Sequence, residues 1–272
     1  MELTTAEKKI QDEAIAYLKQ HEDELIHRFV IAKNPLRVGY ATLFMAGSPG
    51  AGKTEFSQRY IPIAINKKDQ QLKLALRKIH IDITAVDCVL IRIDADEIRE
   101  FFPQYQKTDM KKGIHGNAHI IQKAANKGLD MVRDYCLANN ISFLHDGTFG
   151  NYGTMKKIVQ KSLVVGREIQ IFYLYLDPVT AWQFTKAREY LEGRNIVKEK
   201  FIDQYFNARE NVDRIKREFG DTVKINCVLK DSDNTVKKIE FNLSRIDRFL
   251  DAQYHRGILK RYTREELFDL IF

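Results

Sequence analysis

Cysteine is scarce in this sequence. Only three cysteines occur among 272 residues, and they lie far apart, at Cys88, Cys136 and Cys227. This spacing excludes a disulfide framework and a cysteine-based metal site, and it favours a reducing compartment, which we expect to be the cytoplasm. Histidine offers no zinc site either, because zinc-ligand spacing is missing from His115, His119 and His145.

Long apolar runs, internal repeats, low-complexity linkers and a signal-peptide pattern are also missing from the sequence. A membrane-spanning helix needs about 20 consecutive apolar residues. We therefore expect no membrane attachment, and either one large domain or a domain with a small appendage. A capping box at Thr4 and Glu7 precedes apolar residues at helical spacing, which predicts one helix of about six turns within residues 1–36. This helix either packs on the core or serves as a detachable regulatory arm.

The charge balance is basic, with a net charge of +7 and an isoelectric point of about 9.1. Such a balance suits either a nucleic-acid surface or a pocket that holds several phosphates. Lysine and arginine are dispersed among acidic residues and form no stripe interleaved with aromatic residues. This pattern disfavours nucleic acid as the partner.

One glycine-rich stretch has a specific chemical meaning. It fits the pattern G-x-x-x-x-G-K-[ST], it follows an apolar run at residues 40–46, and residues 55–60 can continue as a helix. A strand, a glycine loop and a helix in this order form a P-loop, whose backbone N–H groups surround phosphate oxygens. Its lysine reaches the β- and γ-phosphates, and its threonine hydroxyl ligates Mg²⁺. The nucleotide-binding residues are therefore expected to be Gly47, Ser48, Pro49, Gly50, Ala51, Gly52, Lys53 and Thr54.

Further strands and helices alternate along the chain. We expect strands at residues 88–94, 141–145 and 169–176, followed by a hairpin at 223–241. We expect helices at 116–140 and 198–219, a helix that starts at Pro178, and a last helix that starts after Thr263. This alternation predicts an α/β fold with a mainly parallel sheet covered by helices on both faces. Within a P-loop domain of residues 37–272, we expect a helical insertion at 61–87, a lid-like segment at 181–200 and a C-terminal hairpin with helices at 220–272.

Acidic residues follow two of the predicted strands, where ligands of parallel sheets bind. Asp94 and Asp96 end the second strand, and alternation would put both carboxylates on one face. One of them can accept a proton from a substrate hydroxyl, hold Mg²⁺ through water, or cap the next helix; we prefer Asp96 as the base and Asp94 as its support. Asp146, followed by Gly147 and Thr148, ends the third strand and is either a Mg²⁺-binding carboxylate or part of a turn.

Two arginines after the fourth strand are candidates for stabilising charge on a transferred phosphoryl group. Arg188 lies on a predicted helix, and Arg194 follows the glycine that ends it. Such arginines can stabilise the developing negative charge. The alternative is that both are ordinary solvated side chains without a catalytic role. Four aromatic residues can stack on a nucleotide base, although core packing is their default role, namely Phe149, Tyr152, Tyr173 and Tyr175.

With these motifs the chain resembles the zeta toxin family of P-loop kinases, over about residues 36–220. The matching parts are the P-loop, the stretch from Ile93 to Asp96 before Phe102 and Pro103, then Asn126, the Asp-Gly-Thr motif at 146–148, and the two arginines. The resemblance implies a kinase that uses ATP or GTP with Mg²⁺ to phosphorylate the 3′-hydroxyl of UDP-N-acetylglucosamine. It also implies toxicity and an antitoxin protein that covers the nucleotide site.

Carried over by position, the resemblance makes Asp96 the catalytic base and Lys53, Arg188 and Arg194 its catalytic partners. Thr54 and Asp146 become the Mg²⁺ residues. Substrate contacts are implied for Asp94, Asp96, Asn126, Asp146 and Thr148. The chain departs from the family in having aspartate at position 146, where glutamate is usual, and in residues 61–87. Three alternatives remain. The first is a kinase whose acceptor is a nucleoside, an antibiotic or a polynucleotide end. The second is a non-catalytic nucleotide-binding switch, and the third is a nucleic-acid-binding protein.

Overall fold

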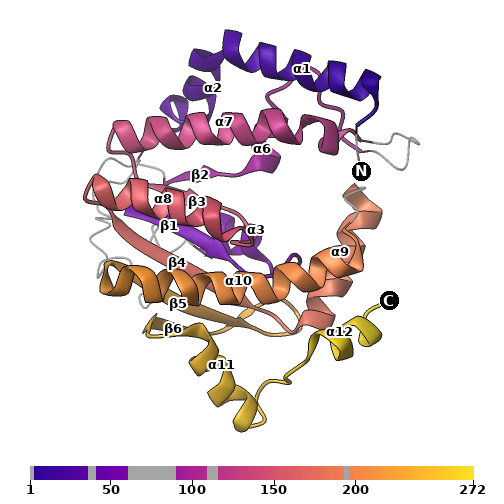
Figure 1. Ribbon diagram of the computed structural model, residues 1–272, viewed down its shortest axis with the longest axis vertical. Coiled ribbons are helices and arrows are strands. Elements are labelled where there is room, and N and C mark those ends of the chain that lie inside the picture. The colour runs from indigo at the N-terminus through magenta and orange to yellow at the C-terminus, as the bar shows by residue number, and fades with distance from the viewer. Residues whose placement is uncertain (1–2, 36–40, 61–89, 109–115, 193–195) are drawn as a thin grey trace.

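Six strands form one sheet in the computed structural model, which describes residues 3–35, 41–60, 90–108, 116–192 and 196–272 (Figure 1). The strand order is β2-β3-β1-β4-β5-β6, and every pair is parallel except β5 with β6. This arrangement confirms the predicted α/β class. The bounds are β1 (Ala41–Ala46), β2 (Ile91–Ile93), β3 (Phe143–His145), β4 (Glu168–Tyr175), β5 (Val223–Lys230) and β6 (Val236–Leu243).

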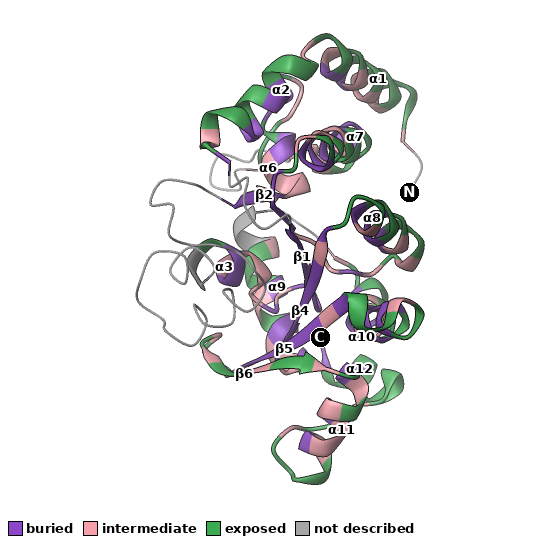
Figure 2. Ribbon diagram, turned by 90° about the vertical axis from the view of Figure 1, so that its left-hand side faces the viewer, coloured by how far each residue is buried: buried purple, intermediate pink, exposed green. Residues whose placement is uncertain are grey.

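Helices lie on both faces of this sheet. One face is covered by α7 (Ala118–Ala138), α8 (Tyr152–Val164) and α10 (Lys198–Phe219), and α3 (Lys53–Glu55) lies on the other face, where a π-helical turn at Phe56–Tyr60 continues it (Figure 2). All six residues of β1 are buried, as the centre of a doubly covered parallel sheet requires. After the N-terminal segment, the described residues also form the helices α6 (Ala95–Arg99), α9 (Pro178–Glu192), α11 (Ile246–His255) and α12 (Arg264–Leu270).

The N-terminal segment differs from the prediction of one helix. Two helices occur, α1 (Thr5–Gln20) and α2 (Glu22–Phe29), followed by a short 3₁₀ turn at Ile31–Lys33. The break falls at His21, whose ring nitrogen Nδ1 lies 2.9 Å from the carbonyl of Tyr17. Three acidic residues then begin α2, where they favour a new helix N-terminus.

The core consists of two hydrophobic clusters. The larger one contains β1, β4 and β5 with α8 and α10. The smaller one joins Leu18 of α1 and Leu25 of α2 to α7, β2 and the region of Ile98 in α6. The N-terminal helices thus lie on the outer side of α7 (Figure 1).

Most other elements agree with the expectations. Asp177 caps α9 by accepting from the N–H groups of Val179 and Thr180 at 3.0 and 3.2 Å. The hairpin forms, and Thr263 makes the capping box of α12. The helix α8 was not predicted, although its buried residues follow helical spacing, as Met155, Ile158, Val159 and Ser162. The insertion at 61–87 and Cys88 lie outside the described residues.

No helix in the described ranges combines the length and the hydropathy that crossing a membrane requires.

The burial of Leu18 makes a prediction about the N-terminal helices. Leu18→Ala removes a side chain that is 1 % exposed, and a cavity of this kind costs about 2–5 kcal/mol. We expect the free energy of unfolding, measured in urea, to fall by that amount in one cooperative transition. Lys9→Ala, at an exposed position of the same helix, is the control and should change little. A separate early transition that leaves the main one unchanged would show that α1 is a detachable arm.

Candidate functional site

The P-loop connects β1 to α3, and its shape depends on glycine. Gly50 has a φ of +73°, and a Cβ atom at this position would lie 2.0 Å from the carbonyl oxygen of Ala181 in α9. Only a residue without a side chain fits so close to the α9 backbone. The Lys53 ammonium folds back over the loop and donates to the carbonyl oxygens of Gly47 (3.1 Å) and Ser48 (2.5 Å).

The helix α9 brings Arg188 to the P-loop. Ala181 and Thr185 contact the position of Gly50, and Arg188 lies three residues further along the same helix face. Its guanidinium is close enough to Lys53 to lower the pKa of the lysine. Arg188 is exposed, as a residue that meets an incoming ligand has to be. Arg194 lies outside the described residues.

Burial lowers the pKa of Lys53 to about 8. The carboxylate of Asp146 acts in the opposite direction, and Arg188 adds to the lowering. Asp146 and Arg188 therefore both lie near the Lys53 ammonium, one directly after β3 and the other on α9. A lysine so placed gains its full charge when an anion binds beside it.

Arg92 of β2 joins the ends of neighbouring strands. Its guanidinium pairs with Asp94, with Glu97 and with Asp146, the last at 2.8 Å. The Nε atom donates to Asp146 at 2.9 Å and to the Ser57 hydroxyl at 3.1 Å. Burial lowers the pKa of Arg92, but the three carboxylates outweigh this effect and leave the pKa raised.

The sequence analysis missed Arg92. Its signal was an arginine between Ile91 and Ile93, two residues before Asp94 and so on the same face of the strand.

Asp94 and Asp96 do not share a strand face, so that prediction is wrong. β2 ends at Ile93, Asp94 is the N-cap of α6, and Asp96 lies in the first turn of that helix. The chain leaves the strand because the Asp94 carboxylate accepts the N–H of Asp96 at 2.9 Å, as a helix cap does. Burial raises the pKa of Asp94 to about 6, with further raising by Asp96 and Asp146, although Arg92 lowers it.

Asp96 lies at the start of a chain of polar contacts that reaches α7. Its carboxylate pairs with Arg99, which also donates to Gln122. Gln122 donates to Asn126 at 2.8 Å. Asn126 is therefore connected to Asp96 through Arg99 and Gln122. The Asp96 side chain is 34 % exposed, so a ligand can reach it.

Asp146 connects β3 to the helix after the P-loop. The single proton of the Ser57 hydroxyl lies between two acceptors, the Asp146 Oδ2 atom at 3.0 Å and the carbonyl oxygen of Thr54 at 2.9 Å. The Asp146 Oδ1 atom has no protein partner in the ranges that the structure describes. The backbone of the same loop touches the P-loop, since Gly47 N–H donates to Thr148 O at 3.3 Å.

A divalent cation fits the oxygens that are present here. The Asp146 Oδ1 atom and the Thr54 hydroxyl are hard oxygen donors of the kind that Mg²⁺ prefers. No group of three or more histidine, cysteine, aspartate or glutamate side chains in the described ranges could hold a metal ion. Few protein ligands suit Mg²⁺, which keeps several waters and takes substrate phosphates as its other ligands.

Three of the four aromatic candidates are core residues, as their default role predicted. Phe149, Tyr173 and Tyr175 are each at most 2 % exposed, and Tyr152 packs against the larger cluster. His145 is also buried, and burial lowers its pKa to about 4, with Arg133 contributing. The buried rings of Phe149, Tyr173, Tyr175 and His145 therefore offer no stacking surface to a ligand.

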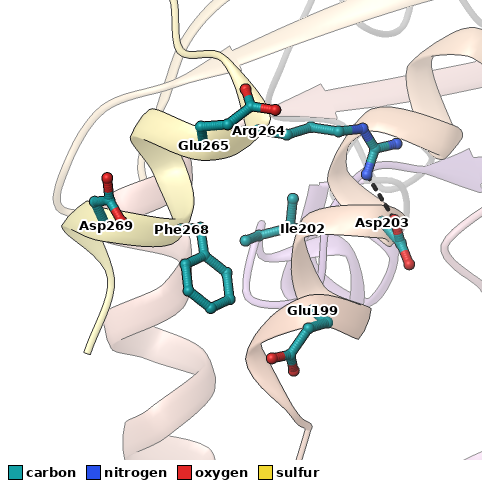
Figure 3. A pocket seen from close by; sticks show the side chains of 7 residues that line it. All are labelled: Glu199, Ile202, Asp203, Arg264, Glu265, Phe268 and Asp269. Carbon is teal, nitrogen blue, oxygen red and sulfur yellow. Dashed lines mark hydrogen bonds and ion pairs between the residues drawn. The ribbon is translucent and has the colours of Figure 1, made fainter.

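A cavity of about 390 Å³ lies at a different place, between α10 and α12 (Figure 3). Four of its seven lining residues are acidic, and Arg264 pairs with one of them, Asp203, at 2.6 Å. Neither the P-loop nor the strand ends contribute to its lining. An acidic lining repels phosphates, so this cavity is not the nucleotide site.

Several solved structures share this fold, including the following two. One is described as the PezAT chromosomal toxin-antitoxin system of Streptococcus pneumoniae; it has 14% identity and a TM-score of 0.50 and covers 99% of this chain and 89% of its own. The other is described as AvrRxo1-ORF1:-ORF2 with ATP, and it has 10% identity, a TM-score of 0.51 and coverage of 94% and 74%. At these identities the likeness concerns the fold alone.

Sequence comparison gives a family but no individual relative. None of the curated proteins matches the chain. The model of the family described as Zeta toxin matches residues 75–242, which include Asp94, Asp96, Asp146 and Arg188 and begin after the P-loop. Because the match covers more than half of the chain, the protein belongs to the zeta toxin family.

Proposed function

We propose that the protein is a Mg²⁺-dependent kinase that transfers the γ-phosphate of ATP or GTP to a sugar hydroxyl. The observation that carries this proposal is that a P-loop lysine and the carboxylates that follow β2 and β3 lie at the same edge of the sheet. Lys53 is near Asp146, and Asp146 is joined to Asp94 through Arg92. A nucleotide switch needs no proton acceptor beside its phosphates, so the exposed carboxylate of Asp96 favours an enzyme.

In this proposal the P-loop holds the nucleotide. The backbone N–H groups of residues 47–54 surround the phosphates, and Lys53 turns from its two loop carbonyls to the β- and γ-phosphates. Thr54 and Asp146 would hold Mg²⁺, which neutralises charge on the phosphates when it is bound. The solved structure whose description names ATP is consistent with a nucleotide on this fold.

Asp96 is the proposed base. Its carboxylate accepts the proton of the acceptor hydroxyl while the hydroxyl oxygen bonds to the γ-phosphorus and the bond to the β-phosphate oxygen breaks. The nucleoside diphosphate leaves, and the phosphorylated acceptor carries the transferred group. Lys53 and Arg188 stabilise the charge that spreads over the phosphoryl oxygens. The pair with Arg99 fixes the orientation of the Asp96 carboxylate before the acceptor arrives.

The acceptor that we propose first is the 3′-hydroxyl of UDP-N-acetylglucosamine. Support comes from membership in the zeta toxin family and from the net charge of +7, which suits two bound polyphosphates. We also propose an antitoxin partner that covers the nucleotide site, because the description of one structure with this fold names a toxin-antitoxin system. Incubation with labelled ATP and a panel of nucleotide sugars, nucleosides and polynucleotides tests the acceptor.

Lys53→Met tests the nucleotide site. In the protein without nucleotide, Lys53 loses its charge as the pH rises through about 8. Nucleotide affinity should therefore be constant below that pH and should weaken by up to about tenfold per pH unit above it. We expect the variant to bind weakly at every pH, to lose this dependence, and to transfer no phosphate. Titration of a fluorescent ATP analogue between pH 7 and 9.5 measures the affinity of both proteins and its dependence on pH. An unchanged pH dependence in the variant would contradict this role of Lys53.

Asp96→Asn and Asp94→Asn separate the base from its support. The first keeps the size of the side chain and removes the proton acceptor, so single-turnover transfer should fall about 10²-fold or more with nucleotide affinity unchanged. The second keeps the N-cap of α6 but breaks the pair with Arg92, so it should cost less in transfer and more in thermal stability. The reverse order of the two transfer rates would exchange their roles.

Expression in bacteria tests the toxin part of the proposal. Phosphorylation of a precursor of the cell wall depletes it, so wild-type protein should slow growth or cause lysis. Lys53→Met, expressed to the same level on a blot, should not. Equal toxicity of both proteins would separate toxicity from phosphate transfer, and harmless expression of an active kinase would exclude the toxin role alone.

A further inference from the structure

The sheet order gives the bound nucleotide a direction. The proposed base and Asp146 follow β2 and β3, which lie on one side of β1 and its P-loop. The phosphate that is transferred has to face these carboxylates. The nucleoside half therefore points to the opposite side, over the ends of β4 and β5.

A polar turn occupies that side. Asp231 to Thr235 connect β5 to β6, and Asn234 closes the turn by donating its N–H to Asp231 O at 2.8 Å. The turn approaches the P-loop at Gly52, which has a φ of +73°. A Cβ atom at Gly52 would lie 2.4 Å from the Lys230 Nζ atom and 2.3 Å from the Asn234 Oδ1 atom. Glycine at this position leaves room for both polar groups beside the loop.

Two of these polar atoms are buried without hydrogen bonds. The Lys230 side chain has no exposed surface, and its ammonium finds no hydrogen-bond acceptor in the described ranges; its nearest charged partner is Glu55, at 3.9 Å. The Asn234 amide nitrogen donates to Glu55 at 2.5 Å, whereas its Oδ1 atom is buried and finds no donor there. A buried ammonium without a hydrogen bond is costly, and Glu55 at 3.9 Å is too far away to supply one.

We propose that Lys230 and Asn234 bind the nucleoside half of the nucleotide, a site that rests on the proposed function. One group is a donor and the other an acceptor. A phosphate offers only acceptors, which would leave the Asn234 oxygen unpaired, whereas the sugar and base of a nucleoside offer both donors and acceptors. Burial lowers the pKa of Lys230, which Glu55 and Asp233 oppose, and a bound acceptor would restore the preference for the charged form.

The test compares a complete nucleotide with a ligand that has only phosphates. ADP and inorganic tripolyphosphate, each with Mg²⁺, are titrated calorimetrically into wild type, Lys230→Met and Asn234→Gly. Methionine keeps the length of the side chain, and glycine keeps the φ of +68° at position 234. Lys224→Met, at the opposite end of β5, is the matched control.

We expect both variants to bind ADP at least about tenfold more weakly than wild type and to bind tripolyphosphate within twofold of wild type. For Lys230→Met, this loss is the size expected when a hydrogen bond to a charged group is removed. The thermal midpoint of unliganded Lys230→Met should not fall, because the variant removes a buried cation that has no hydrogen bond and only a long ion pair with Glu55.

An equal loss for ADP and tripolyphosphate would overturn the inference in favour of a phosphate or P-loop contact. Unchanged binding of ADP would overturn it outright, as would a lowered thermal midpoint with unchanged binding. Failure of wild type to bind either ligand would instead overturn the proposed function on which this site rests.

Discussion

The guanidinium of Arg92 is the interaction on which the site depends. It is the group that β2, β3, α6 and the helix after the P-loop share, through Asp94, Asp146, Glu97 and Ser57. Parallel strands bring carboxylates to one edge of a sheet, where like charges repel one another. A buried arginine with its planar fork of donors offsets this repulsion and fixes the directions of three carboxylates at once.

The same edge balances two opposite demands on charge. In the proposed mechanism the phosphates are met by the cations of Lys53 and Arg188, and the proposed base is the carboxylate of Asp96. The two sets come from different sides of the loop, since Arg188 is carried by α9 and Asp96 by α6. In the protein without ligand, burial lowers the pKa of Lys53 and raises the pKa of Asp94, which disfavours the charged form of each. A bound ligand of opposite charge offsets this cost and stabilises the charged form.

Patterns that depend on neighbours in the sequence predicted most of the fold. The apolar run of β1, the capping boxes of α1 and α12 and the P-loop could all be predicted, because each is set by spacing along the chain. Asp94 and Asp96 were placed on one strand face because nothing in the alternation reveals that Asp94 turns the chain into a helix. The positions of Arg92 and Lys230 depend on which strands lie side by side, and strand order is a property of the whole sheet.

The two hydrophobic clusters give the molecule a modular construction. Residues of the nucleotide side, such as Ala51 and Phe56, are rooted in the larger cluster, whereas Ile98 and Phe101, which support α6, belong to the smaller one. Even β3 is divided, with Phe143 in one cluster and Leu144 in the other. Substitutions that reshape the proposed acceptor side can therefore accumulate around α6 and α7 while the packing behind the P-loop stays intact. Under the proposed function, the phosphate-donor side and the acceptor side of the site are therefore anchored in different parts of the core.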